Sequence, residues 1–218
     1  MKCKLFFLLV FTAVAGTAQA APKVHAIAFG KWMPVKYFSG PDESHGVDLK
    51  VRALYVDGRL HEFTLGASHD VTDRLFVVRR VVRLNDSLPE ESPAAPRWIW
   101  RPDGWLVVDR GSGRVSPLAL PQFDAVASSV SWYRDYAAYC GTSDDGQKLY
   151  AMLFELGRRK PLLAKACDAS KSGASACPAP RWQRLPPRVT FDMGKDQSFT
   201  YMLGEHSASI AIEGPEED

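Results

Sequence analysis

Short apolar or alternating runs, separated by turn residues about every 8 to 12 positions, constrain this chain more than any other feature. The clearest case is VDLKVRALYVDGRLHEFTL, in which Asp57-Gly58 lies between two strand-like runs. Asp-Gly favours a type I′ turn because both central residues of that turn adopt positive φ. The pattern therefore predicts that residues 47–56 and 59–65 pair as a β-hairpin.

The rest of the chain continues this pattern and indicates an all-β protein. RLFVVRRVVRLND is rich in β-branched residues and predicts a strand that ends at Asn85-Asp86. The Pro-rich stretches 87–96 and 167–187 are interpreted as connections, and the densest strand pattern lies between them. No window of 12 or more residues after the N-terminal segment has an amphipathic helical pattern. We expect small antiparallel sheets and essentially no helix.

The N-terminal segment predicts export. Lys2 and Lys4 precede an apolar run, Leu5 to Ala15, and Ala18-Gln19-Ala20 has the small-x-small pattern of a signal peptidase site. The run is shorter than the roughly 20 residues that span a bilayer. A buried N-terminal helix is the alternative. We expect residues 1–20 to be a signal peptide cleaved after Ala20, leaving residues 21–218 as a single domain in the periplasm or outside the cell.

The charge balance argues against two classes of partner. Cleavage would remove two of the 27 Lys and Arg residues and no acid, so 25 basic side chains would face 25 acidic ones. Non-specific nucleic-acid binding needs a surplus of cations, and so does recruitment to anionic lipid. No later stretch is long and apolar enough to span a membrane. We therefore expect no nucleic-acid partner and no transmembrane segment in the mature chain.

Three cysteines follow the cleavage site: Cys140, Cys167 and Cys177. An exporting pathway delivers them to a compartment where disulfides persist. Cys167 and Cys177 flank DASKSGASA, a small-residue loop that closes easily, and no nearby Cys or His completes a metal site. We predict a disulfide between Cys167 and Cys177. Cys140 is left as a buried strand residue or, alternatively, a reactive thiol.

Two stretches of the central region look like repeats of one sheet unit. Trp100 is followed three residues later by Asp103, and Trp132 three residues later by Asp135. Each pair precedes an apolar run that fits a buried strand. GRVSPL and GRRKPL then follow, 44 residues apart, beginning at Gly113 and Gly157. Small sheets of this kind cannot bury both faces alone and stack on their neighbours.

WRPDGWLVVD and VSWYRDYAAYCGTSDDGQKLYAMLFELGRR resemble blades of the TolB-type and Trp-Asp-repeat-like β-propellers, over residues 97–166. The matching residues are Trp100, Pro102, Asp103 and Gly104 in the first unit and Trp132, Asp135, Asp144, Asp145 and Gly146 in the second. The resemblance implies a turn at Pro102-Asp103-Gly104 and a protein that serves as a binding platform, and it carries over no catalytic residue. The fold is expected to be propeller-like or an irregular sandwich.

The ionisable residues define no reaction. Gly-x-Ser-x-Gly and Gly-x-x-x-x-Gly-Lys motifs are absent, and Asp144-Asp145 precedes Gly146, as in a turn. His61 shares a strand face with Phe63 and Leu65, so we expect it to be partly buried. His45 and His69 lie in turn-like segments beside acids and would bind a metal if the fold joined them.

The leading hypothesis is an exported, non-catalytic binding protein whose ligand is a protein, peptide or glycan. We assign no catalytic, cofactor-binding or metal residue. A secreted hydrolase with a site assembled from loops is the alternative, and a metal-binding protein is a third. Six tryptophans would either line a groove or wedge between small sheets. These are Trp32, Trp98, Trp100, Trp105, Trp132 and Trp182.

Overall fold

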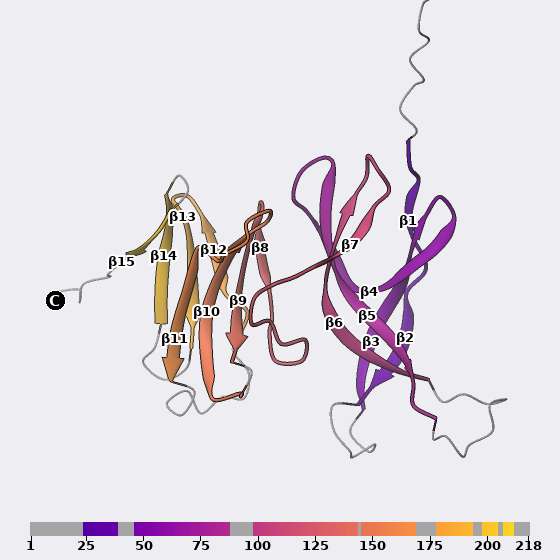
Figure 1. Cartoon of the computed structure of the whole chain (residues 1–218), viewed down its shortest axis with the longest axis horizontal. Helices are drawn as coiled ribbons and strands as arrows, with labels where there is room; N and C mark the ends of the chain where they lie inside the picture. Colours follow the sequence, from indigo (N-terminus) through magenta and orange to yellow (C-terminus); the bar gives the residue numbers. More distant parts are fainter. Residues whose placement is uncertain are drawn as a thin grey trace, which may run out of the picture.

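The computed structural model describes residues 24–38, 46–87, 98–143, 145–168, 178–193, 198–204 and 207–211. All regular elements in these ranges are β-strands, as predicted, and they form three antiparallel sheets. Figure 1 shows two lobes joined by one connection, with the first sheet in one lobe and the other two in the second. No sheet closes into a barrel. The described residues include no helix that is long and apolar enough to cross a membrane.

The N-terminal sheet has seven strands. They are β1 (Ile27–Phe29), β2 (Met33–Tyr37), β3 (Val47–Val56), β4 (Arg59–Asp70), β5 (Leu75–Asn85), β6 (Trp98–Asp109) and β7 (Val115–Leu118). The order is β1-β3-β4-β5-β6-β7, and β1 and β2 pair with successive parts of the same edge of β3. The sheet curls so that β2 approaches β6 without hydrogen bonding to it.

The predicted hairpin is confirmed. Strands β3 and β4 pair around Asp57 and Gly58, whose φ angles of 51° and 75° are those of a left-handed turn. Strand β5 ends at Asn85, where the sequence pattern placed its end.

The predicted turn at Pro102-Asp103-Gly104 is wrong, because β6 continues through these residues. Arg79 pairs with Trp105 and Val81 with Pro102, so Asp103 and Gly104 together lie opposite one residue of β5. This is a β-bulge, a position where a strand tolerates a proline that donates no hydrogen bond. The three residues therefore bend a strand and do not reverse the chain.

The middle and C-terminal sheets are four-stranded meanders. The middle sheet contains β8 (Ser131–Tyr133), β9 (Tyr136–Thr142), β10 (Lys148–Glu155) and β11 (Leu163–Asp168). The C-terminal sheet contains β12 (Arg181–Arg184), β13 (Pro187–Asp192), β14 (Ser198–Gly204) and β15 (Ser207–Ala211). In both sheets every strand pairs with the next one along the chain. The second sequence unit is therefore one antiparallel sheet, as expected.

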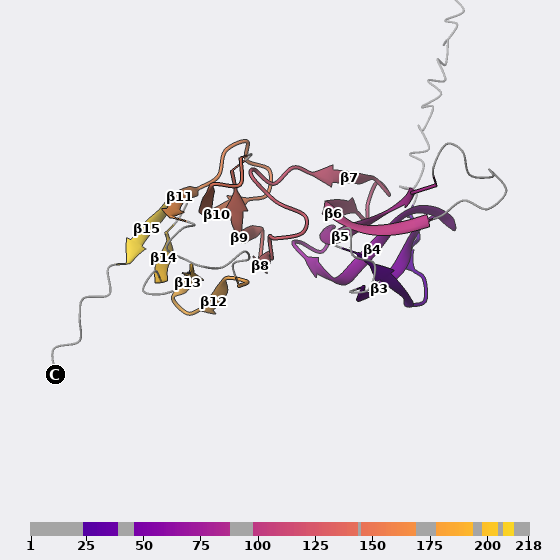
Figure 2. The same ribbon diagram turned by 90° about the horizontal axis from the view of Figure 1, so that it is seen from below.

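Both faces of the middle sheet are covered. Ala138 and Cys140 of β9 pack against the C-terminal sheet, whereas Ala137 and Tyr139 pack on the opposite side with residues of the N-terminal sheet. Alternate residues of a strand point to opposite faces, so both sets must be apolar. This explains why β9 is an almost continuous apolar run. Figures 1 and 2 show the middle sheet between its two neighbours.

The second Pro-rich stretch is not a simple connection, which corrects the interpretation of residues 167–187. Strand β11 extends to Asp168, and β12 pairs with β13 around the cis Leu185–Pro186 bond. Of the first stretch, residues 88–96 lie outside the described residues.

Candidate functional site

The tryptophans serve two different purposes. Trp105 is 8% exposed and meets the Trp132 ring edge-to-face at 5.3 Å between the N-terminal and middle sheets. Trp182 packs on Tyr133 and donates its Nε1–H to the Ser131 carbonyl at 3.0 Å, which links the middle and C-terminal sheets. These three wedge between sheets, as one of the two sequence hypotheses proposed.

The other three tryptophans lie on the N-terminal sheet, away from the sheet junctions. Trp32 and Trp98 are 45% and 46% exposed. Trp100 lines a concave surface of about 390 Å³, which we call the aromatic groove. Its lining residues are Gly30, Lys31, Met33, Ala53, Tyr55, Leu60, Phe63, Arg83 and Trp100.

Strand register brings the aromatic groove together. Ala53 pairs with Phe63, and Arg83 pairs with Trp100. Directly paired residues point to the same face of a sheet, so these side chains share one surface although they come from four strands. The Phe63 and Trp100 rings meet edge-to-face at 4.9 Å. The curl of the sheet brings Met33 of β2 to the same groove.

The chemistry of the aromatic groove suits binding. Lys31 and Arg83 are the only charged side chains among its lining residues. The Arg83 guanidinium lies 4.2 Å from the centre of the Trp98 ring, so a second aromatic extends the surface beyond Trp100. Acid–base catalysis needs ionisable groups held within reach of one another, and the lining residues provide no carboxylate or histidine for it.

A second cavity, of about 500 Å³, lies where the three sheets meet; we call it the junction pocket. It is lined by His69, Asp70, Val71, Trp132, Tyr133, Arg134 and Arg184. His69 and Asp70 end β4, Trp132 and Tyr133 belong to β8, and Arg184 ends β12. Each sheet therefore contributes to the wall. Figure 1 shows β8 on the side of its lobe that faces the N-terminal sheet.

His69 is held in the junction pocket by two contacts. Its Nε2 lies 2.7 Å from the carbonyl oxygen of Arg134, and its ring stacks on Trp132 with centroids 5.8 Å apart and planes 21° apart. The metal hypothesis paired His69 with His45, which lies outside the described residues. Among the described residues no group of three His, Cys, Asp or Glu side chains could hold a metal ion.

His61 is exposed, so the expectation of a partly buried histidine is wrong. A register shift between Leu54 and Tyr55 interrupts the alternation of β3 against β4 close to His61. Because of this shift, simple strand alternation does not place His61 on the same partly buried face as Phe63.

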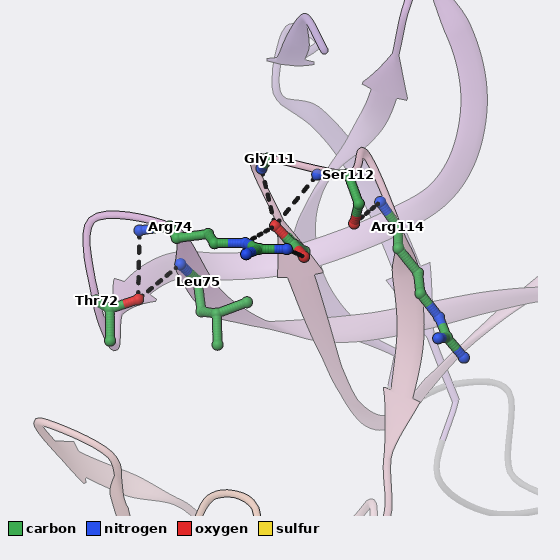
Figure 3. A network of polar contacts seen from close by, with 7 residues as sticks. Thr72, Arg74, Leu75, Gly111, Ser112 and Arg114 are labelled. Atoms are coloured by element: carbon green, nitrogen blue, oxygen red, sulfur yellow. Dashed lines mark hydrogen bonds and ion pairs between the residues drawn. The ribbon is translucent and has the colours of Figure 1, made fainter. Parts of the chain in front are cut away.

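A network of turns lies beside the junction pocket and fixes one of its walls. Figure 3 shows Arg74, Gly111 and Ser112 converging on one carboxylate, that of Asp109. Arg74 donates to both oxygens, at 2.7 and 2.6 Å. The Arg74 guanidinium holds the pKa of Asp109 well below its ordinary value, and the N–H groups of Gly111 and Ser112 act in the same direction. The turns after β4 and β6 are thereby joined.

The same turns neutralise the only acid in the junction pocket. The Asp70 carboxylate pairs with Arg110 at 2.6 Å, and Arg110 also donates to the Asp73 carbonyl at 3.2 Å. The lining residues contain no second carboxylate and no Ser, Thr or Cys. The carboxylate pair or activated nucleophile that a hydrolase needs is thus not assembled by these side chains.

Asp145 has the turn role expected from its sequence. Its carboxylate accepts hydrogen bonds from the Ser143 hydroxyl and from the Gln147 N–H, the latter at 3.0 Å. These bonds, the Ser143 bond first, lower the pKa of Asp145. Gly146 follows with a φ of 68°. Asp144 lies outside the described residues.

Cys140 is a buried strand residue, 3% exposed, and its sulfur lies 3.5 Å from the Met193 sulfur. The Cys140 sulfur takes part in a disulfide bond, so Cys140 is not the free reactive thiol of the alternative hypothesis. Cys177 and the side chain of Cys167 lie outside the described residues. The Cys167–Cys177 disulfide therefore stays a prediction.

Comparison with known proteins yields no relative: no family model, no curated protein and no solved structure matches this chain.

Sequence reasoning assigned no function to most residues of these two surfaces. The sequence predicted only a hairpin for Tyr55, Leu60 and Phe63, and only a connection for Arg184. The Asp57-Gly58 turn starts the β3–β4 pairing, and the register shift between Leu54 and Tyr55 then places Ala53 beside Phe63. That turn signal was present in the sequence, whereas the approach of β2 to β6 and the meeting of three sheets depend on long-range packing.

Proposed function

We propose that this protein is an exported, non-catalytic binding protein that holds a peptide in the aromatic groove. The observation that supports this proposal is the lining of the groove, which combines three aromatic rings and aliphatic side chains with two cations and no anion. Binding sites for organic ligands are concave and mostly apolar, with a few polar groups that fix orientation.

A peptide fits the groove better than a glycan. Sugar hydroxyls need several hydrogen-bonding partners, yet the lining residues include no amide or carboxylate side chain. Met33, Leu60 and Phe63 instead offer an apolar surface for an aliphatic or aromatic side chain. Lys31 and Arg83 at the same surface favour an acidic residue next to that side chain.

The remaining parts of the proposal come from the sequence. The predicted signal peptide supports export, and the resemblance of residues 97–166 to propeller blades supports a binding platform. One disulfide among the three cysteines after Ala20 fits an oxidising compartment. Spacing favours Cys167 with Cys177, and because Cys140 is disulfide-bonded, a bond from Cys140 to one of these two cysteines is the alternative.

A library of random peptides, displayed on phage and selected against the purified protein, tests the function. We expect enriched peptides to carry an apolar residue beside Asp or Glu. Leu60→Ala removes an exposed lining residue and should weaken a selected peptide about tenfold, which corresponds to about 1.4 kcal/mol of lost apolar contact.

Leu84→Ala is the matched control, because Leu84 is 41% exposed on β5 but does not line the groove, whereas Leu60 is 52% exposed. Equal affinity of both variants, or selected sequences without a common pattern, would contradict the groove as the site. Cleavage of the selected peptides by the protein would favour the hydrolase alternative.

A further inference from the structure

We infer that the junction pocket is a second binding site, which takes a ligand that carries a carboxylate close to an aromatic ring. The inference is independent of the aromatic groove, because the two sites share no lining residue. It depends on the charge of the pocket, on the stacked aromatic pair in its wall and on the way in which the three sheets assemble it.

The charge of the junction pocket is positive. Asp70 is its only acid and is already paired with Arg110. Arg134 and Arg184 are exposed, and neither forms an ion pair with a carboxylate in the described part of the chain. Two guanidinium groups at one cavity therefore lack a counter-charge there. A planar fork of N–H donors matches the two oxygens of a carboxylate.

The aromatic part of the pocket wall consists of His69 and Trp132, whose rings stack on each other nearly parallel. Both rings are fixed from behind. Trp132 packs edge-to-face on the buried Trp105, and His69 is hydrogen-bonded to the Arg134 carbonyl. A ligand ring that stacks here therefore needs little reordering of the protein, and stacked aromatic rings attract each other beyond the burial of apolar area.

The backbone places both arginines at tight turns. Arg134 has a φ of 53° in the turn between β8 and β9. Arg184 is the last residue of β12 and pairs with Pro187 across a short turn. Because Arg184 and Trp182 are two residues apart, they lie on the face of the C-terminal sheet that is turned toward the middle sheet. Arg181, three residues before Arg184, lies on the opposite face.

Phenylacetate is the probe of choice, and phenylacetamide is its neutral analogue of the same shape. The indole Nε1–H signal of Trp132 in a nitrogen-15 NMR spectrum reports occupancy of the pocket. We expect a saturable shift with phenylacetate and binding at least about tenfold weaker with phenylacetamide, since a charge-assisted hydrogen bond contributes roughly twice as much as a neutral one.

The variants Arg184→Gln and Arg181→Gln remove the same charge from opposite faces of β12. We expect Arg184→Gln to weaken phenylacetate about tenfold and Arg181→Gln to leave it unchanged. If both variants lost the same affinity for phenylacetate, the effect would come from the overall charge of the protein and not from the pocket, and the inference would be overturned. Binding of phenylacetamide as tight as that of phenylacetate, or no saturable Trp132 shift at millimolar concentration, would also overturn it.

The source of the carboxylate is resolved by a second pair of probes. N-acetyl-Gly-Phe carries the same chemistry at a peptide C-terminus, and its C-terminal amide is the control. Tighter binding of the peptide acid than of phenylacetate would identify a peptide C-terminus as the ligand. The opposite order would identify a small aromatic acid, and both outcomes retain the carboxylate requirement.

Discussion

At the scale of single residues, buried hydrogen bonds anchor the segment that joins the two lobes. Ser128 is 2% exposed; its hydroxyl donates to the Cys140 carbonyl at 2.6 Å and accepts from the Asp124 N–H at 3.0 Å. Asp124 in turn accepts from the N–H groups of Val126 and Ala127, both at 2.7 Å. This compact turn is therefore tied directly to the core strand β9.

Ser128→Ala should lower the free energy of unfolding by about 1–3 kcal/mol, because it leaves buried backbone groups without partners. Urea denaturation followed by tryptophan fluorescence measures the change. Ser129→Ala is the matched control, since Ser129 is exposed and makes no hydrogen bond through its side chain among the described residues. It should change the free energy by less than about 0.5 kcal/mol. If both variants lost a similar amount of unfolding free energy, the buried hydrogen bonds of Ser128 would not contribute to stability.

The Asp109 carboxylate gives stability a pH dependence of known sign. Arg74 keeps its folded-state pKa below the ordinary 3.8, so the unfolded chain takes up a proton there first as pH falls. The stabilisation is complete above the ordinary pKa and is lost as pH falls from there toward the folded pKa. Asp109→Asn should therefore flatten the fall of the unfolding free energy below about pH 4.

Urea unfolding midpoints between pH 2 and 6, compared for wild type and Asp109→Asn, measure this effect. Arg74→Gln removes the main cause of the lowered pKa and should flatten the acid limb in the same direction. If both variants keep the wild-type slope, the network in Figure 3 does not couple stability to pH.

At the scale of elements, local patterns predicted strands well and misjudged the places where strands bend. Asp57-Gly58 is a turn because nothing overrides its preference. Pro102-Asp103-Gly104 has turn composition too, yet pairing with β5 before and after the bulge keeps β6 continuous. Turn propensity is a local quantity, whereas a bulge is decided by the partner strands. Likewise, the sequence shows each residue of the aromatic groove, but it does not show that the fold joins them into one surface.

Two glycines, Gly58 in the β3–β4 turn and Gly104 in β6, separate backbone strain from packing. Gly58 has a φ of 75° and Gly104 has no positive φ, and an added Cβ would meet nothing within 4 Å at either position. Gly58→Ala should cost about 1–2 kcal/mol because an L-residue is strained in the left-handed region. Gly104→Ala should be neutral or stabilise by up to about 1 kcal/mol through lower entropy of the unfolded chain.

Thermal and urea unfolding of the two variants provide the comparison. A loss at Gly104 as large as that at Gly58 would mean that the bulge, and not the hairpin turn, is the more demanding backbone element.

At the scale of the whole molecule, three sheets follow one another in chain order. The sequence indicated small stacked sheets because apolar runs recur with turn residues between them. It did not indicate that the first sheet has seven strands, since the pairing of β1 and β2 with one edge of β3 is not a periodic feature. The junction pocket was beyond prediction for the same reason: its residues are up to 115 positions apart in the chain, from His69 to Arg184.

The stack ends at the C-terminal sheet, whose outer face is polar. Arg181, Gln183 and Asp192 are exposed there, and the hydroxyls of Thr190 and Thr200 lie 3.0 Å apart. Its inner face carries buried residues such as Phe191 and Tyr201. The C-terminal sheet thus covers the middle sheet on one side and meets solvent on the other.

The burial of the middle sheet on both faces has a consequence for synthesis. Chains are made from the N-terminus, so β8 to β11 are complete before β12 to β15 exist. During that interval the face bearing Ala138, Cys140 and Leu153 has no cover, although the opposite face can already dock on the N-terminal sheet. An uncovered apolar sheet face is a site of aggregation. This face therefore stays exposed until β12 to β15 have been made and have packed on it.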